Sequence, residues 1–346
     1  MRNSLSAEEA NVINRLMPGN EELGVGTKLK YLLGFATPPG GVVYVDGDNG
    51  DDAAYDGSSW DAPFKTIRAA ITAVNPGGVV VIKPKKIPAG ATDPVDYAEV
   101  ITIPVTKPGI SLVGYGNRTQ GGMPQIKKGS GAAAQITIQA PGCTIAGLGI
   151  NGAGATGGGI LLDDDGLTKS AFGTTIRDCH FKNCKGHATD GTKGGAITWS
   201  SNGGGWQVRI IGNRFYKNLA DIVLLGTGGS IPQDVVIEEN VFSGIAASTD
   251  VNLWLKGGGS GMLGLVIRRN RFGALPSAGG GTVGRYMDLT ECIDTLTKNV
   301  FNCTKLTFKN ASINTRTLVP ATMFIAGNFQ QVAAGAGATG EIGYTA

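Results

Sequence analysis

The sequence contains few of the residues that most often carry catalysis or metal binding. Histidine occurs twice and cysteine five times among 346 residues. The odd number of cysteines matches no disulfide framework, and Cys179, Cys184 and His187 lie close together without a common zinc spacing. We expect free, buried thiols made in a reducing compartment, and no metal site.

Long apolar runs and an excess of one charge are also missing. No window is apolar enough to span a membrane, and the N-terminus lacks the apolar core of a signal peptide. The 30 Lys and Arg residues nearly balance the 27 Asp and Glu residues. Nucleic-acid binding would need clustered positive charge. Neither a membrane nor nucleic acid is therefore predicted as a partner.

What the sequence does contain is a repeat. An aliphatic residue, two variable residues, Asn, one residue and Phe recur in this order at 210–215, 237–242, 267–272 and 296–301. The defining residues of the four copies are Asn213 and Phe215, Asn240 and Phe242, Asn270 and Phe272, and Asn299 and Phe301. A fixed period of about 30 residues indicates one structural unit stacked on copies of itself.

Each unit has the pattern of short strands. Runs rich in Ile, Leu and Val are bounded by Gly, Ser and Asn, and the 56 glycines are assigned to turns. A second strand follows most copies, at 222–225, 251–255, 286–289 and 305–308. This pattern predicts an all-β fold, a single-stranded right-handed parallel β-helix. A β-sandwich would not keep one motif at one period, and propeller blades usually run longer.

Stacking of the coils has consequences for the repeated residues. Equivalent residues of successive coils would lie about 4.8 Å apart. Inward aliphatic residues then form continuous rows, and Phe stacks on Phe. The repeated Asn is expected at a corner, in left-handed backbone, with a hydrogen bond to the neighbouring coil.

The first 35 residues differ from the repeat. Ser6 and Glu9 form a capping box that predicts a helix start. Apolar residues follow at helical spacing and in a second short run; they are Ala10, Ile13, Leu16, Met17, Leu29, Leu32 and Leu33. So few apolar residues cannot form their own core. We expect this arm, separated from the body by the Pro- and Gly-rich linker 36–41, to dock on another subunit or protein rather than on its own body.

The body is predicted at 42–330, and a Gly- and Ala-rich tail follows at 331–346. At 63–73 the pattern is helical, with Asp61 as the expected N-cap and Pro63 in the first turn. This helix is expected to cover the open end of the first coil, where apolar rows and strand edges would otherwise face water.

The start of the body resembles a known superfamily. A strand ending in Tyr-Val-Asp at 44–46, an Asn-Gly-Asp turn, Gly-Ser-Ser-Trp at 57–60 and Phe-Lys-Thr-Ile at 64–67 resemble the entry segment of pectate-lyase-like right-handed β-helix proteins. Similar segments open bacteriophage tailspikes and other virion proteins. The resemblance implies the fold and a homotrimer, but no single activity, since the superfamily mixes lyases, hydrolases and proteins without catalysis. The arm resembles segments that anchor phage appendage or head-decoration proteins.

Three aspartates are candidates for glycoside hydrolysis. Asp221, Asp250 and Asp288 flank or enter the second strand of three units. Carboxylates on adjacent coils would lie about 5 Å apart and those on alternate coils about 10 Å apart, which roughly suits retaining and inverting hydrolysis. Chance placement of Asp on a β-helix gives the same pairs, so no catalytic residue is assigned.

Two acidic clusters could bind Ca²⁺ or could simply hold turns. Asp46, Asp48, Asp51 and Asp52 lack the Gly position and the bidentate Glu of an EF-hand loop. The Asp run at 163–165 also ends a strand, but the Asp and Arg set that pectate lyases use on successive coils is not matched. Turns are favoured for both clusters, and no cofactor is predicted.

Two further groups have both a functional and a structural interpretation. Asp178 and His180 would share one face of a strand, with Cys179 on the other, and a surface Asp–His pair is favoured over catalysis. Three tryptophans would offer a sugar-stacking platform if exposed, although core packing is the commoner role; they are Trp199, Trp206 and Trp254.

The function that these observations favour is structural. We predict a non-catalytic bacteriophage virion protein, made in the host cytoplasm, that decorates the capsid or forms an appendage. It would attach to capsid or tail proteins through the arm at 1–35. One alternative is a polysaccharide depolymerase, either a hydrolase or a lyase. Another is a carbohydrate-binding module that recognises a surface glycan without turnover.

Overall fold

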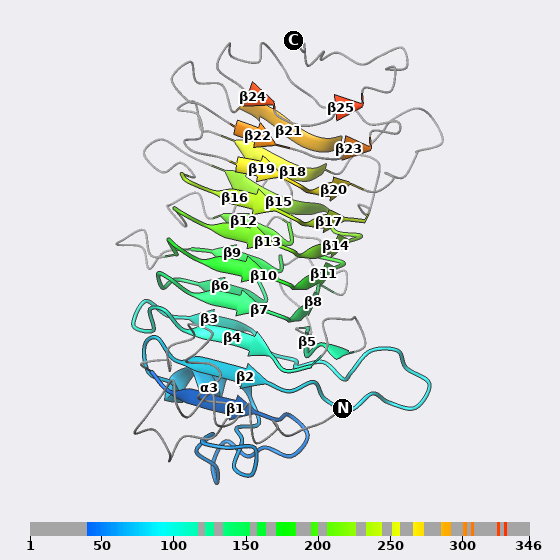
Figure 1. The fold of residues 1–346 in the computed structure, drawn as a ribbon. Helices are drawn as coiled ribbons and strands as arrows, with labels where there is room; N and C mark the ends of the chain where they lie inside the picture. Colours follow the sequence, from blue (N-terminus) through cyan, green and yellow to red (C-terminus); the bar gives the residue numbers. More distant parts are fainter. Residues whose placement is uncertain are drawn as a thin grey trace, which may run out of the picture.

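The computed structural model shows a right-handed parallel β-helix, in which coils of short strands stack along one axis (Figure 1). It describes residues 40–116, 122–127, 134–152, 158–163, 171–184, 195–199, 206–225, 233–243, 251–256, 266–272, 285–291, 300–302, 306–307, 324–325 and 329–330. The predicted arm at 1–35, with its apolar residues, and the predicted tail at 331–346 lie outside the described residues.

The longest sheet follows the whole series of coils. Its strands pair in parallel, each with the strand of the next coil. In spatial order they are β1 (Val42–Val45), β2 (Val79–Ile82), β4 (Ser111–Gly114), β7 (Thr144–Ala146), β10 (Thr175–Arg177), β13 (Arg209–Ile211), β16 (Val236–Glu238), β19 (Val266–Arg268), β22 (Val300–Asn302) and β24 (Phe324–Ile325). The middle residues of β7 to β19 form an unbroken buried row of isoleucines, from Ile145 to Ile267.

Two more sheets complete the walls of the described coils. One contains β3 (Ile101–Ile103), β6 (Ile136–Ile138), β9 (Ile160–Leu162), β12 (Ile197–Trp199), β15 (Ala220–Leu225), β18 (Val251–Lys256) and β21 (Arg285–Glu291). The other contains β5 (Gln125–Ile126), β8 (Gly149–Asn151), β11 (His180–Lys182), β14 (Arg214–Tyr216), β17 (Val241–Phe242) and β20 (Arg271–Phe272). A separate pair follows, β23 (Leu306–Thr307) with β25 (Phe329–Gln330). These strands confirm the predicted fold class.

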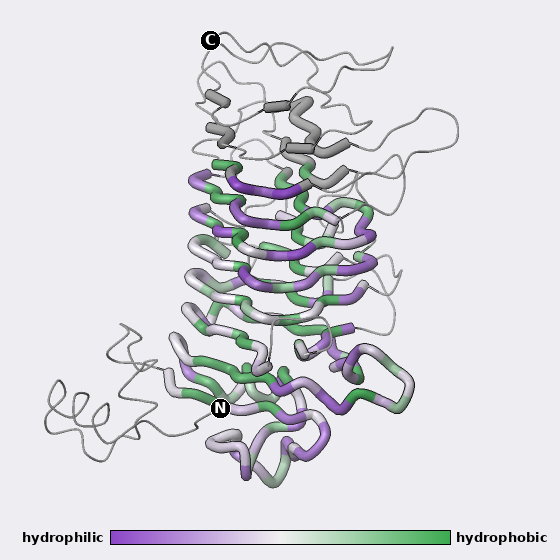
Figure 2. The backbone as a smooth tube through the Cα atoms, turned by 45° about the vertical axis from the view of Figure 1, so that its right-hand side comes forward, coloured by the Kyte–Doolittle hydropathy of each residue, from purple (hydrophilic) through white to green (hydrophobic). Residues whose placement is uncertain are grey.

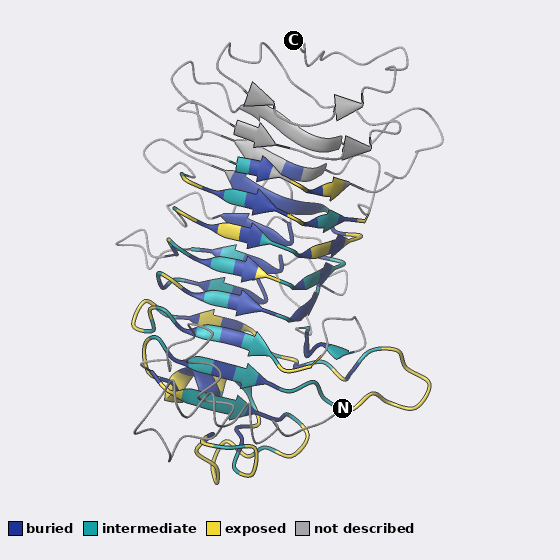
Figure 3. Ribbon diagram, in the orientation of Figure 1, coloured by how far each residue is buried: buried dark blue, intermediate teal, exposed yellow. Residues whose placement is uncertain are grey.

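The apolar core lies inside the walls. Along the coils that Figure 2 colours by hydropathy, hydrophobic and hydrophilic residues alternate, because successive strand residues point to opposite faces of a sheet. Burial follows the same alternation in the middle coils, whereas the first coils carry long exposed loops (Figure 3). The core therefore extends along the axis instead of closing into a single cluster at the centre.

The predicted stack of phenylalanines is present in consecutive coils. Phe215 lies between Phe181 and Phe242, with ring centroids 5.0 Å apart on both sides and interplanar angles of 8° and 11°. The backbone of Phe272 occupies the same register position one coil further. Phe181, which belongs to none of the four copies of the repeat, thus shares one row with the Phe of the first three copies.

Phe301 departs from this prediction. Its backbone pairs with Ile267 in the longest sheet, and so joins the isoleucine row instead of the phenylalanine row. Both rows are inward and apolar, so the hydrophobic pattern does not decide which of them a given Phe enters. Asn299, the partner of Phe301 in the repeat, lies outside the described residues.

The repeated Asn forms a buried ladder. The Oδ1 atom of Asn240 accepts hydrogen bonds from N and Nδ2 of Asn213, at 2.9 and 3.0 Å. The Nδ2 atom of Asn240 donates to the carbonyl of Ile210 at 2.9 Å. In the next coil, Oδ1 of Asn270 likewise accepts from N and Nδ2 of Asn240. In the preceding coil, Oδ1 of Asn213 accepts from the backbone N–H of Cys179. The predicted bonding between coils is confirmed, and it satisfies polar groups that are wholly buried.

The left-handed corner lies one residue earlier than predicted. Asp178, Glu239 and Arg269 have φ of 54°, 58° and 55°, and Gly212 has φ of 67°. Gly212, Glu239 and Arg269 directly precede the three ladder asparagines, and Asp178 precedes Cys179, whose backbone N–H donates to the ladder. The left-handed residue makes the sharp bend, and the residue after it is then aimed into the core, where its amide meets the amide of the next coil.

The helix of the first coil, α3 (Ile67–Ala73), packs against β1, β2 and β3 and buries Ile67, Ala70 and Ile71. This confirms that a helix covers the core at the start of the described β-helix. It begins later than predicted, however. The N-cap is Thr66, whose Oγ1 accepts from the N–H of Ala69 at 3.2 Å, and Asp61 is not involved.

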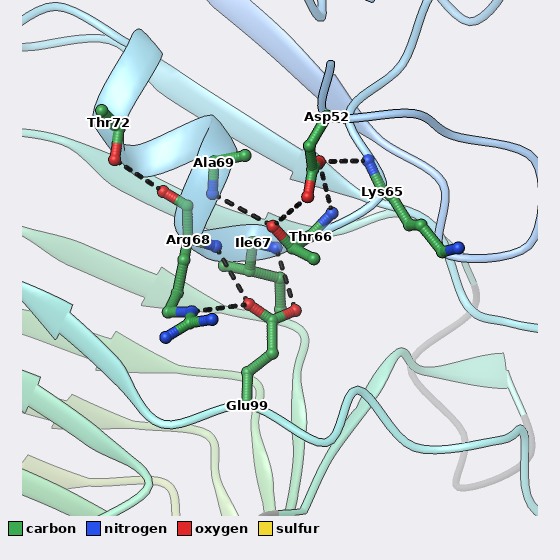
Figure 4. A network of polar contacts seen from close by, with 8 residues as sticks. All are labelled: Asp52, Lys65, Thr66, Ile67, Arg68, Ala69, Thr72 and Glu99. Carbon is green, nitrogen blue, oxygen red and sulfur yellow. Dashed lines mark hydrogen bonds and ion pairs between the residues drawn. The ribbon is translucent and has the colours of Figure 1, made fainter. Parts of the chain in front are cut away.

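Two carboxylates from outside the helix complete its N-terminus (Figure 4). Glu99 accepts from the N–H groups of Ile67 and Arg68 at 3.0 and 3.1 Å. Asp52 accepts from the backbone of Lys65 and Thr66 at 2.7 and 3.0 Å, and from the Thr66 hydroxyl at 2.8 Å. These contacts satisfy donors that the first turn leaves open. A pattern confined to 61–73 could not show this start, because Glu99 lies in a later coil.

Candidate functional site

Two members of the aspartate series proposed for hydrolysis, Asp221 and Asp288, belong to described strands, and they do not share a row of the sheet. Asp221 is fully buried and accepts a hydrogen bond from Nδ2 of Asn218 at 2.8 Å. Asn218 in turn accepts from the backbone N–H of Cys184 at 2.9 Å. Asp221 therefore fixes a second buried corner of the coil, which is a structural role.

The register also separates the members of this series. Ala220 pairs with Val251, so that Asp221 stands beside position 252, whereas Asp288 pairs with Trp254. The two aspartates thus occupy different rows of the sheet, and Asp250 lies outside the described residues. The repeat length between 221 and 288 is irregular, and a shift of a few residues is enough to break a row.

The acidic segment at 46–52 is a turn whose carboxylates bind protein donors. Asp46 Oδ1 accepts from the N–H groups of Asp48 and Asn49 at 3.0 and 3.2 Å, and its Oδ2 accepts from Lys83 Nζ at 2.6 Å. Asp51 Oδ1 accepts from two later backbone N–H groups of the same turn. The turn interpretation is confirmed, and it explains why Asp and Asn are dense here.

The environment of Asp46 lowers its pKa. Burial acts to raise the pKa of this carboxyl, but the hydrogen bonds from Lys83, Asn49 and the backbone of Asp48 together outweigh that effect. Asp46 is only 3% exposed. The ionised form is thus held in place by charge-assisted hydrogen bonds.

Asp178 and His180, the candidate acid–histidine pair, lie on opposite sides of a bend in the chain. Asp178 and His180 do not share a strand, because the left-handed bend at Asp178 lies between β10 and β11. Burial, followed by the charges of Lys182 and Arg214, lowers the pKa of His180. The residues Asp164, Asp165 and His187 lie outside the described part of the chain.

The described thiols are buried and unreactive. Cys143, Cys179 and Cys184 are free, as predicted, and burial raises the pKa of each to about 12. A thiol with such a pKa stays protonated and is a poor metal ligand. Among the described residues, no group of three His, Cys, Asp or Glu side chains could hold a metal ion.

The tryptophans chosen from the sequence do not form an exposed platform. Trp199 is fully buried, and Trp206 packs partly buried against the core. For Trp254 the structure describes the backbone alone. Packing is confirmed for the first two, as expected for aromatic residues inside a strand pattern.

A different aromatic cluster lies on the surface of the first coils. Trp60 lies between Tyr44 and Tyr115, with ring centroids 4.7 and 5.3 Å apart. Tyr115 is 57% exposed and Trp60 37% exposed, while Tyr44 is half-buried. The ammonium group of Lys83 lies 5.8 Å from the Trp60 ring centroid and binds Asp46. We call these four residues, Tyr44, Trp60, Lys83 and Tyr115, the aromatic platform.

Strand register explains how this platform assembles. Tyr44 is in β1 and its register partner in β2 is Val81, two residues before Lys83. Tyr115 directly follows β4, and its backbone N–H donates to the carbonyl of Ile82 at 2.7 Å. Trp60 comes from the loop between β1 and α3. Sequence reasoning missed the group because its members are 16 to 71 positions apart, although a Trp in a Gly-Ser-Ser turn outside any strand was a usable signal.

The comparisons with known proteins concern the fold. No protein-family model and no curated protein sequence matches this chain. Among solved structures, it is similar to the pectate lyase Pel9A, with 14% identity, a TM-score of 0.39 and coverage of 82% of this chain and 78% of that one. It is also similar to the GH136 lacto-N-biosidase from Eubacterium ramulus, with 12% identity, a TM-score of 0.31 and coverage of 93% and 73%. No described helix is long and apolar enough to cross a membrane.

Proposed function

We propose that this chain is a non-catalytic structural protein of a bacteriophage particle, a stiff β-helical rod that attaches through the arm at 1–35. The observation that carries the proposal is the use of the acidic residues. Asp221, Asp46 and Asp52, the described carboxylates nearest to a chemical role, all hold backbone or side-chain donors of the fold. Carboxylates engaged in this way brace a structure, and they leave little capacity for proton transfer to a substrate.

Stiffness along the axis supports the same proposal. The isoleucine row, the phenylalanine stack and the asparagine ladder each continue through successive coils. The described middle coils therefore pack on their neighbours with apolar contacts and buried hydrogen bonds, in the manner of solenoid proteins. A rod of this kind suits a part that projects from a particle or braces its surface, and a trimer of such rods would add lateral support.

The test is particle association. Antibodies raised against the purified full chain should label gradient-purified particles from the source culture, and a variant that lacks residues 1–35 should fold but fail to be incorporated. Normal incorporation without the arm would refute attachment through it, and absence of the chain from particles would refute the virion role. Sedimentation of the purified chain tests the trimer, which requires three times the monomer mass.

A depolymerase remains the alternative, and it makes a contrasting prediction. The purified chain would release reducing ends or unsaturated products from capsular or pectic polysaccharides, and an Asp288→Asn or Asp250→Asn variant would lose that activity. Carbohydrate recognition without turnover is the second candidate, and one specific observation, the aromatic platform, favours it.

A further inference from the structure

The aromatic platform is not needed for the stacking of the coils. Its rings lie outside the buried core, and residues Trp60 and Tyr115 expose 37% and 57% of their surface. An aromatic ring that served packing alone would gain most by full burial. Here two rings of the first coil, those of Tyr44 and Trp60, meet the ring of Tyr115 from a later coil at the surface.

The rings are held in place before any ligand arrives. The Tyr44 N–H donates to the carbonyl of Gly57, and the Phe64 N–H donates to the carbonyl of Tyr44, both at 2.9 Å. Gly57 has φ of +73°, and a Cβ there would lie 2.4 Å from the Phe64 ring. The loop that carries Trp60 is therefore fastened to β1 on both sides. Little conformational freedom remains to be lost when a ligand binds.

Lys83 adds a polar donor at the edge of the rings. Its side chain is 43% exposed, and Asp46, whose side chain is 5% exposed, holds it at 2.6 Å. An ammonium group has three donors. The contact with Asp46 uses one donor and fixes the position of the group, which leaves donors for hydroxyl oxygens of a ligand next to Trp60.

These features point to one class of ligand. A pyranose ring has an apolar face of C–H groups and a rim of hydroxyls, so it can stack on an aromatic ring while its rim takes hydrogen bonds. We propose that the aromatic platform is a carbohydrate-binding site that takes one or two neutral pyranose units of a surface glycan. The rings of Trp60 and Tyr115 would form the stacking surface, and Lys83 would bind the hydroxyls.

Nucleic acid would also use stacked aromatic rings, but the local charge disfavours it. Asp46 and Asp48 lie beside Lys83 and Lys86, and Asp48 Oδ2 accepts from the Lys86 backbone at 2.7 Å. A site that follows a phosphate backbone needs an uncompensated positive groove. The mixed charges here suit a neutral ligand better. This inference goes beyond the rod function and stands or falls independently of particle attachment.

The experiment uses the purified full chain on an array of neutral and uronate-containing oligosaccharides, followed by titration calorimetry with the best ligand. We expect binding to a neutral glycan that varies little with salt, since a charged ligand would be screened. Trp60→Ala should weaken this binding about tenfold or more, as loss of a central aromatic contact does. Trp60→Phe, which keeps a ring, should restore part of it.

The matched control is Tyr216→Ala. Tyr216 is an exposed aromatic residue at 42%, but it lies on β14, in a different sheet from the platform strands. Its removal should leave the affinity unchanged, and circular dichroism should show all three variants folded. Failure of the wild-type chain to bind any neutral glycan would overturn the proposal. Equal binding by Trp60→Ala, or a preference for single-stranded oligonucleotides, would overturn it as well.

Discussion

The first coils and the middle coils of this β-helix differ in how regularly their residues repeat. In the middle coils, from β7 to β20, the same residue type recurs at the same position of successive strands. In the first coils the rows are less regular, and long loops are fastened by carboxylates such as Asp46, Asp52 and Glu99. The repeated rows of the middle coils therefore supply stiffness, whereas the irregular first coils supply a shaped surface.

The apolar row of the middle coils should carry the largest energetic effect. Phe215→Ala removes a buried ring stacked on both sides, and we expect it to lower the free energy of unfolding by about 3–5 kcal/mol. Chemical denaturation measures the change. The adjacent residue Tyr216 is exposed, so Tyr216→Ala should cost less than about 0.5 kcal/mol. Similar losses in the two variants would mean that this strand does not face the core as described.

Loss of the asparagine ladder should cause the second-largest drop in the free energy of unfolding. Asn240→Ala leaves the N–H and Nδ2 groups of Asn213 and the carbonyl of Ile210 without their buried partner, at a cost of about 2–4 kcal/mol.

The first coils provide the control for the ladder. Asn49→Ala removes one side-chain hydrogen bond to Asp46, in an exposed turn, and should cost less than about 1 kcal/mol. If the two asparagines proved equally important under the same denaturant titration, the contrast between repetitive and irregular coils would lose its basis.

A smaller effect than that of the ladder is expected at Asp46, and it depends on pH. Its pKa is lowered in the folded state, so the unfolded chain binds more protons as the pH falls. The stabilisation is present above the unfolded pKa of about 3.9 and is lost as the pH falls through the lower folded value.

We therefore expect Asp46→Asn to be less stable than the wild type by about 1–3 kcal/mol at neutral pH. The difference should shrink steadily in denaturation curves recorded from about pH 5 downward. A difference that stayed constant across this range would show that the Asp46–Lys83 contact does not depend on the ionised carboxylate.

The regular middle coils could be predicted from the sequence better than the irregular first coils. The Asn and Phe of the repeat identified the β-helix, because each row depends on residue types that recur at a fixed spacing. Phe301 was assigned to the wrong row, since two inward rows accept the same side chain. The helix start at Thr66 was missed because Glu99 completes it from another coil.

The functional candidates depended still more on three-dimensional contacts. Asp221 has the residue type of a catalytic acid, but its hydrogen bond to Asn218 inside the coil makes it structural. The platform residues Tyr44, Trp60 and Tyr115 share no motif, and only strand register and a pinned loop bring them together. A single sequence gives no direct indication that residues so far apart in the chain contact one another.

The most direct test of the central claim, that like residues stack coil upon coil, is an experimental structure that resolves the side-chain amides of the ladder. We predict that Oδ1 of Asn240 lies close to 2.9 and 3.0 Å from N and Nδ2 of Asn213. Phe215 should lie parallel between Phe181 and Phe242. Ladder amides turned toward solvent, or phenylalanines from these coils in separate rows, would contradict the account.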